Sequence, residues 1–344
     1  NYLWIFAAIM YGLSLYSYAV TWAIVPLSII VCGIYILCSK IKISYGYLIA
    51  AMGILFVLAI PLILFVLVNN GYINEIRTAI FSVPKLTVMR DSELSFKNLT
   101  EPASYQNFIN VVLKQYDGLP WNSTEQFGLF YAISAPFALV GVCRMVGEAT
   151  KKIKKKEFSY EVLCIAVSIC CVICCLMVSN LNVNKANMLH FFSAVFIAEG
   201  VAEVCALIKK ENYLRYAVAA GYIVCFICFS VYYFGSYNDT IGWYFNCGAG
   251  EAITYLDSIN NEKICVDTSI YHSQVLFYDK TPVEEYLETV AYTDADAAYR
   301  NAESFCEYKF GIDYYNLKEY DAYIVPADKT GHFDDAEWEI TVFE

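Results

Sequence analysis

Long apolar runs alternate with short polar stretches over the first two thirds of the sequence. A helix that crosses a bilayer needs about 20 mostly apolar residues. Seven runs approach this length, at 2–17, 19–38, 47–69, 127–146, 159–178, 188–208 and 214–234. The first two nearly abut, so 2–17 is alternatively a truncated or re-entrant piece, and the count is then six. The pattern predicts a polytopic α-helical membrane protein with about seven spans.

Beyond residue 234 the apolar runs end and short helix-like and strand-like patterns alternate. We expect helices over 251–259, 283–291 and 297–308, and strands over 263–266, 322–325 and 338–343. Such a mixture indicates a small α/β domain. It contains no glycine-rich nucleotide motif and no nucleophile elbow. The predicted domains are therefore a transmembrane domain over 1–234 and a C-terminal α/β domain over 235–344.

The connection over 70–126 is much longer than two helices need, which is typical of a functional or separately folded loop. Within it, Tyr105–Tyr116 places Phe108, Val111 and Val112 at helical spacing among polar residues. This spacing predicts an amphipathic helix that lies in the membrane interface.

Composition and charge agree with a membrane location. The chain is 58% hydrophobic and only 17% charged. Clusters of Lys and Arg lie at 39–43, 144–156 and 207–215, and all three fall on one side of the membrane if the spans alternate. Basic loops stay cytoplasmic, so we expect a multi-pass plasma-membrane protein with its C-terminal domain outside. That domain holds 22 of the 34 acidic and 6 of the 23 basic residues, a net charge of −16, which argues against nucleic acid as a partner.

The cysteines do not predict a metal centre. Cys170, Cys171, Cys174 and Cys175 resemble a metal-binding motif, but they lie within an apolar run without neighbouring His or carboxylate. We expect them to pack as small apolar side chains, and we assign no metal ligand. Cys247, Cys265 and Cys306 follow the last span, so at most one disulfide is expected among them.

Three polar stretches carry the candidate chemistry. The turn SNLNVNKANMLHFF (179–192) includes Lys185 and Asn187, which are suited to a phosphate and to sugar oxygens. The loop phrase PKLTVMRD adds Lys85 and Arg90. The phrase YDGLPWNS adds Asp117 and Asn122. The alternative is that these are solvated turn residues, with Lys185 snorkelling to water.

A different reading comes from Glu199 and Glu203, which lie on one face of a predicted span. A carboxylate at membrane depth is costly and is a functional candidate. Lys209 and Lys210 are near enough in sequence to pair with Glu203, but not with Glu199. This pair therefore keeps open a transporter with a proton or ion path. A third alternative is a non-catalytic membrane anchor for the C-terminal domain.

Taken together, YGLSLYSYAVTWAIVPLSII, VPKLTVMRD, YDGLPWNS, FGLFYAISAPFALVG and NVNKANMLHFF resemble the C-terminal part of bacterial GT-C membrane glycosyltransferases. The similar group depends on a phospholipid carrier and is related to protein O-mannosyltransferases and the aminoarabinose transferase of lipid A. The resemblance implies transfer of a sugar from a polyprenyl-phosphate donor to an acceptor at the outer face of the membrane. The family's catalytic Asp would lie upstream of Asn1, since we expect this sequence to be part of a longer protein. Lys185 also stands where the family has an arginine.

On this basis Lys85, Arg90 and Lys185 are assigned to the donor phosphate. Asp117, Asn122 and Asn187 are assigned to sugar binding or loop ordering. The expected partners are the lipid-linked sugar donor and membrane lipids, with the acceptor and any requirement for a divalent cation left open.

Overall fold

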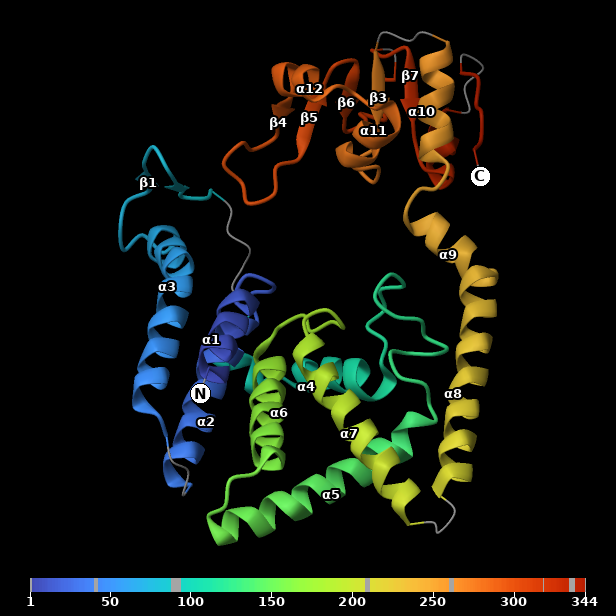
Figure 1. Cartoon of the computed structure of the whole chain (residues 1–344). Coiled ribbons are helices and arrows are strands. Elements are labelled where there is room, and N and C mark those ends of the chain that lie inside the picture. Colours follow the sequence, from blue (N-terminus) through green and yellow to red (C-terminus); the bar gives the residue numbers. More distant parts are fainter. Residues whose placement is uncertain are drawn as a thin grey trace. The chain divides into compact units, whose positions relative to one another are not determined.

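The computed structural model describes residues 2–39, 43–87, 94–207, 211–259, 263–317, 319–333 and 338–343. Contacts divide the chain into two compact units, Asn1–Val83 with Asp91–Phe234, and Pro84–Arg90 with Gly235–Glu344 (Figure 1). We call them the membrane unit and the C-terminal unit. A short piece of the 70–126 loop thus belongs with the C-terminal unit.

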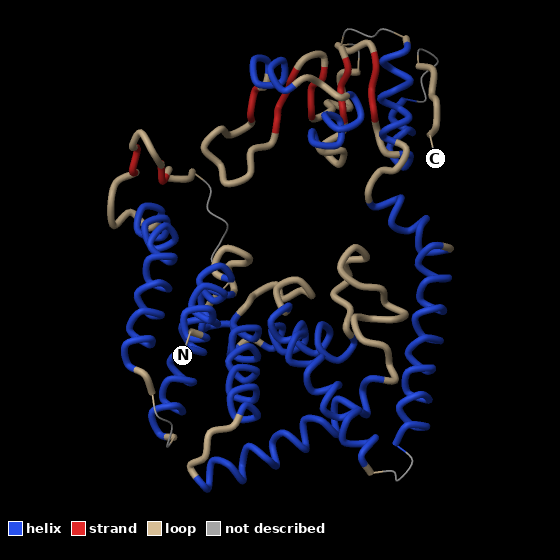
Figure 2. The backbone as a smooth tube through the Cα atoms, in the orientation of Figure 1, coloured by secondary structure: helices blue, strands red, loops and turns tan. Residues whose placement is uncertain are grey.

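The membrane unit is helical, which confirms the predicted class of polytopic helical protein (Figure 2). Within the described residues, five helices are long and apolar enough to cross a bilayer, rather than about seven. These are α2 (Thr21–Cys38), α3 (Tyr45–Asn69), α6 (Tyr160–Met177), α7 (Asn187–Ala206) and α8 (Glu211–Phe234). The first predicted span is α1 (Leu3–Ser14), whose 12 residues are too few to cross alone.

The span predicted over 127–146 is also wrong. The helix in this region, α5, begins at Ser134 and continues to Lys155 through residues that were expected to form a basic loop. Residues 127–133 are held in turns, because the Gln115 side-chain oxygen accepts the backbone N–H groups of Leu129 at 3.1 Å and Phe130 at 2.6 Å. α5 carries Arg144 at its middle and several lysines toward its C-terminal end. These charges make α5 too polar to be one of the apolar span-length helices.

α5 and α7 cross backbone to backbone at two glycines. A Cβ atom added at Gly141 would overlap the carbonyl oxygen of Phe196, and one added at Gly200 would overlap that of Phe137. Small residues allow membrane helices to approach this closely. The crossing fixes α7, the helix that begins at the asparagine-rich turn.

The core of the membrane unit is formed by buried residues of several elements, including Cys171, Cys174 and Cys175 of α6. This confirms that these cysteines act as apolar packing residues. The predicted amphipathic helix exists as α4 (Pro102–Ile109), which continues into a π-helical turn, η2 (Asn110–Lys114). Val111 is part of the core, and Phe108 and Val112 pack against it. The apolar face of this helix therefore covers protein.

Shorter elements complete this unit. They are a two-stranded ribbon of β1 (Ile76–Arg77) and β2 (Ser82–Val83), and a 3-10 helix, η1 (Phe96–Thr100).

The C-terminal unit is built on a mixed five-stranded sheet with the order β4-β5-β6-β3-β7. The central strand β3 is parallel to its neighbours β6 and β7. Strand β5 pairs antiparallel with both β4 and β6. The strands are β3 (Ile264–Val266), β4 (Ala291–Tyr292), β5 (Ala302–Phe305), β6 (Tyr308–Phe310) and β7 (Ala322–Ile324). The helices are α9 (Ser236–Tyr244), α10 (Ala249–Ser258), α11 (His272–Asp279), α12 (Val283–Thr289) and the 3-10 helix η3 (Ala327–Phe333). The predicted α/β class is confirmed.

Two sequence predictions for this unit are wrong. The helix expected over 297–308 is the β5–β6 hairpin, whose turn places Cys306 at a positive φ of 44°. The segment 338–343, expected to be a strand, lies in no strand of the described structure. Trp338 instead packs its ring against Tyr323 and Phe333.

Candidate functional site

The asparagine-rich turn between α6 and α7 is held by its own side chains. The Asn182 carbonyl oxygen (Oδ1) accepts the backbone N–H of Lys185 at 2.9 Å. The Lys185 ammonium donates to the backbone oxygen of Asn180 at 2.7 Å. The Lys185 residue is only 6% exposed. The alternative in which Lys185 snorkels to water is therefore wrong, because its side chain folds back onto the turn.

Asp117 joins the long loop to this turn. One of its carboxylate oxygens, Oδ2, accepts the backbone N–H of Val183 at 2.8 Å and the side-chain amide of Asn122 at 2.7 Å. The other, Oδ1, accepts the backbone N–H of Leu119 at 2.9 Å. The Asn122 side-chain oxygen in turn accepts the amide of Asn184 at 2.7 Å. Two sequence motifs separated by about sixty residues thus form one hydrogen-bonded assembly.

Further loop residues bind the end of α6, just before the turn. The Asn98 amide donates to the Met177 backbone oxygen at 2.7 Å, and the backbone N–H of Ser95 donates to the same oxygen at 3.0 Å. The Asn107 amide reaches the Ser179 oxygen at 3.4 Å. Sequence reasoning missed these three residues. The only signal was their polar character, which does not identify a partner so distant in the chain.

The remaining predicted residues are dispersed. Asn187 is exposed and begins α7, so it lies at the end of the same turn. Lys85 is exposed but belongs to the C-terminal unit. Arg90 lies outside the described residues. The structure thus brings Asp117, Asn122, Lys185 and Asn187 into one region and assigns Lys85 to the other unit.

His190, one turn into α7, lies directly beyond this region. Its ring packs edge-on against Phe130, with centroids 6.3 Å apart. Its Nε2 atom is buried and, within the described part of the chain, has no hydrogen-bond partner. A buried polar atom of this kind is ready to accept or donate one bond.

The carboxylates of Glu199 and Glu203 both pair with Arg144 of α5. The guanidinium contacts Glu199 in a short ion pair and reaches Glu203 at 3.2 Å. The Tyr160 hydroxyl also donates to Glu199 at 2.9 Å. The expectation that Glu199 lacks a structural partner is wrong. Its partner lies 55 positions away in sequence.

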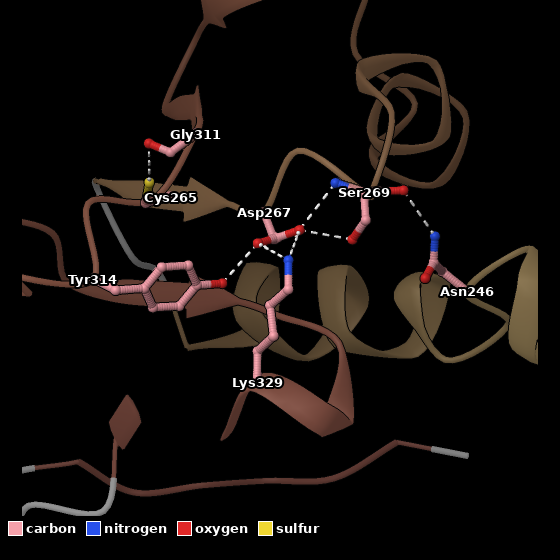
Figure 3. Close-up of polar contacts among 7 residues, drawn as sticks. All are labelled: Asn246, Cys265, Asp267, Ser269, Gly311, Tyr314 and Lys329. Carbon is pink, nitrogen blue, oxygen red and sulfur yellow. Dashed lines mark hydrogen bonds and ion pairs between the residues drawn. The ribbon is translucent and has the colours of Figure 1, made fainter. Parts of the chain in front are cut away.

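The C-terminal unit contains a second polar cluster, which sequence reasoning also missed (Figure 3). Asp267 follows β3 and is 3% exposed. Its carboxylate accepts the Tyr314 hydroxyl at 2.6 Å, the Lys329 ammonium at 2.9 Å and the Ser269 hydroxyl at 2.7 Å. A polar residue directly after a buried strand was the signal that could have identified it.

Electrostatics in this cluster favour the charged carboxylate. Burial opposes ionisation of Asp267, but the bonds from Tyr314, Lys329 and Ser269 outweigh it and lower the pKa to about 2. Burial and the neighbouring Asp267 carboxylate raise the pKa of Tyr314. The carboxylate accepts bonds from several donors, so this cluster ties the loop after β3 to the loop after β6 and to η3.

No group of three or more His, Cys, Asp or Glu residues is placed to hold a metal ion in the described parts of the chain. A search of protein-family models, of curated proteins and of solved structures finds none that matches this chain. The fold itself defines the class: a multi-pass helical membrane protein with a small C-terminal α/β sheet.

Proposed function

We propose that this protein transfers a sugar from a polyprenyl-phosphate-linked donor to an acceptor at the outer face of the membrane. The observation that carries the proposal is the assembly of the asparagine-rich turn with the long loop through Asp117, Asn122 and Asn184. This assembly lies at the ends of two span-length helices, α6 and α7. A polar surface there is within reach of a lipid headgroup.

In this proposal the roles within the assembly divide by chemistry. Asp117 already accepts three N–H groups, so it orders the loop and leaves acid–base chemistry to another residue. The exposed Asn187 offers an amide to sugar or phosphate oxygens. Lys185 supplies a positive charge beneath the turn, which favours a pyrophosphate or phosphate above it. Lys85 and Arg90 remain candidates for further phosphate contacts.

Ion pairing makes the transporter a weaker alternative. Glu199 and Glu203 share Arg144, so their charge has a structural explanation. A proton or ion path would have to break these pairs in each cycle.

The test is sugar transfer by the full-length protein in proteoliposomes that contain a polyprenyl-phosphate sugar donor. Lys185→Met keeps the length of the side chain and removes its charge. Loss of the attraction between this buried charge and the donor phosphate should lower use of the donor roughly ten- to a hundredfold, a change of about 1.4–2.8 kcal/mol. Lys185→Arg should recover much of the activity, because it restores the charge.

Matched controls separate binding from folding. Asn70→Ala removes an exposed amide that bonds only locally, to Val66, and should leave transfer within twofold. Asn182→Ala is unsuitable as a control, since Asn182 holds the turn. Each variant should keep its thermal unfolding midpoint within a few degrees to be scored. Unchanged donor use by both Lys185→Met and Asn187→Ala would overturn the proposal.

A further inference from the structure

The long loop after α3 contacts the C-terminal unit at a residue that the proposed function does not use. The Thr87 hydroxyl donates to the Asp294 carboxylate at 2.6 Å. The Thr87 backbone N–H donates to the Asp296 oxygen at 3.2 Å. These two bonds join positions more than 200 residues apart in the chain.

Both acceptors lie in one structured connection, the loop between β4 and β5. Asp294 is itself fixed there, since its other carboxylate oxygen accepts the Asp296 N–H at 2.9 Å. The loop is closed at its base, where the N–H of Thr293 donates to the Asn301 oxygen at 3.0 Å. The Thr87 hydroxyl and the Asp296 N–H lower the pKa of Asp294, so the acceptor is ionised at neutral pH. Thr87 therefore meets a preformed pair of acceptors.

We propose that Thr87 and Asp294 form a latch by which the C-terminal unit holds the loop segment 84–87 in place. Segment 84–87 is part of the C-terminal unit, and the bond to Asp294 keeps the exposed Lys85 at a defined position on that unit. Thr87 and Asp294 are positioning residues that act through this segment.

The latch has a direct readout, because trypsin cleaves after lysine and Lys85 lies two residues before Thr87. Cleavage requires the chain on both sides of the bond to adopt an extended, mobile form. Thr87→Val keeps the shape of the side chain and removes the hydroxyl donor. Asp294→Asn keeps the shape of the acceptor and removes its charge.

Cleavage after Lys85 should be measured by mass spectrometry on the full-length protein in lipid nanodiscs. Both variants should be cut faster there by roughly two- to tenfold, the effect of one exposed hydrogen bond. Asp313→Asn, which changes another loop carboxylate of the same unit, should match the wild type. The double variant Thr87→Val with Asp294→Asn should be cut no faster than the faster single variant, since both changes remove one contact.

Unchanged cleavage after Lys85 in both single variants would overturn the latch. So would an additive effect in the double variant. Neither measurement depends on sugar transfer, so the latch and the proposed function fail separately.

Discussion

In the membrane unit, α5 and α7 meet where two glycines let carbonyl groups of the opposite helix approach. In the C-terminal unit, a buried carboxylate accepts bonds from Lys329 of η3, from Tyr314 after β6 and from Ser269 of its own loop. The first contact depends on the absence of side chains and the second on their charge. A bilayer supplies no water to drive apolar association, so close fit between helices carries more of the stability there. A small sheet has a limited apolar core, so buried polar contacts contribute more of its stability.

The comparison extends to the two aspartates that organise loops. Asp117 accepts N–H groups of three neutral residues, and a further amide bond links Asn122 to the exposed Asn184. Asp267 is neutralised by Lys329 and enclosed. The open network is therefore the better candidate for recognising a ligand, and the closed one is the better candidate for stability.

The largest effect is expected at the helix crossing. Gly141→Ala places a methyl group against the Phe196 carbonyl, which only a separation of α5 from α7 can relieve. We expect a loss of more than about 4 kcal/mol, seen as little folded protein in detergent. Gly147→Ala is the matched control on the same helix, since a Cβ there meets nothing within 4 Å. Equal yields and melting midpoints for the two variants would show that the close crossing of α5 and α7 does not determine the stability of the membrane unit.

The next effect concerns the buried Asp267 cluster. Asp267→Asn leaves the Lys329 ammonium without its anion, and the C-terminal unit should lose about 2–4 kcal/mol of unfolding free energy. Hydrogen exchange of peptides from β3, β6 and β7 should speed up, while those from α5 and α7 stay protected. Asp328→Asn, beside the same lysine in sequence but exposed, is the control. Faster exchange in the membrane helices would show that the two units do not unfold separately.

A smaller effect is expected at the open network. Asp117→Asn loses charge and cannot accept all three N–H groups, so we expect about 1–2 kcal/mol of local destabilisation. Hydrogen exchange of peptides covering 116–123 and 179–186 should speed up in both, because these two loops are hydrogen-bonded to each other. Glu125→Gln, an exposed carboxylate of the same loop, should leave both unchanged. If only one of the two peptides responded, the assembly would not act as one site.

The smallest effect is a dependence on pH in the C-terminal unit. The pKa of Asp267 is lowered to about 2 from an ordinary value of 3.8. Its contribution is therefore complete above about pH 4 and is lost as the pH falls toward 2. Thermal unfolding followed by Trp fluorescence should show a larger fall in midpoint between pH 5 and pH 2.5 for the wild type than for Asp267→Asn. Equal falls would assign the acid sensitivity to other carboxylates.

Local pattern was enough to predict much of the fold. The apolar length of α2, α3, α6, α7 and α8 marks each as a span candidate. In the C-terminal unit β3, α10, α12 and β7 lie where the pattern places them. Residues 127–133 are as apolar as a span. However, the side-chain oxygen of Gln115 accepts the backbone N–H groups of Leu129 and Phe130, and the segment forms turns instead of a helix. The helix expected over 297–308 has helical composition, yet pairing of β6 with β3 decides its structure.

The candidate site was predictable in its parts and not in its connections. Asp117, Asn122 and Lys185 attract notice because polar residues interrupt apolar sequence. The bond from Val183 to Asp117 spans 66 positions, and no local pattern specifies it. Arg144 was read as a charge of a basic loop, although it lies on a helix facing Glu199. Long-range pairing of this kind depends on how helices pack, which periodicity does not encode.

The burial of the α6 cysteines has a practical consequence for chemical labelling. Cys170, Cys171, Cys174 and Cys175 are each at most 2% exposed, so a water-soluble maleimide should not reach them in the folded protein. Cys38, at the end of α2, and Cys247, in the C-terminal unit, are exposed. Two further cysteines, Cys143 of α5 and Cys228 of α8, are also exposed. Once these two are replaced by serine, Cys38 near the basic 39–43 segment and Cys247 on the acidic unit can report sidedness in sealed vesicles with a reagent that does not cross the bilayer.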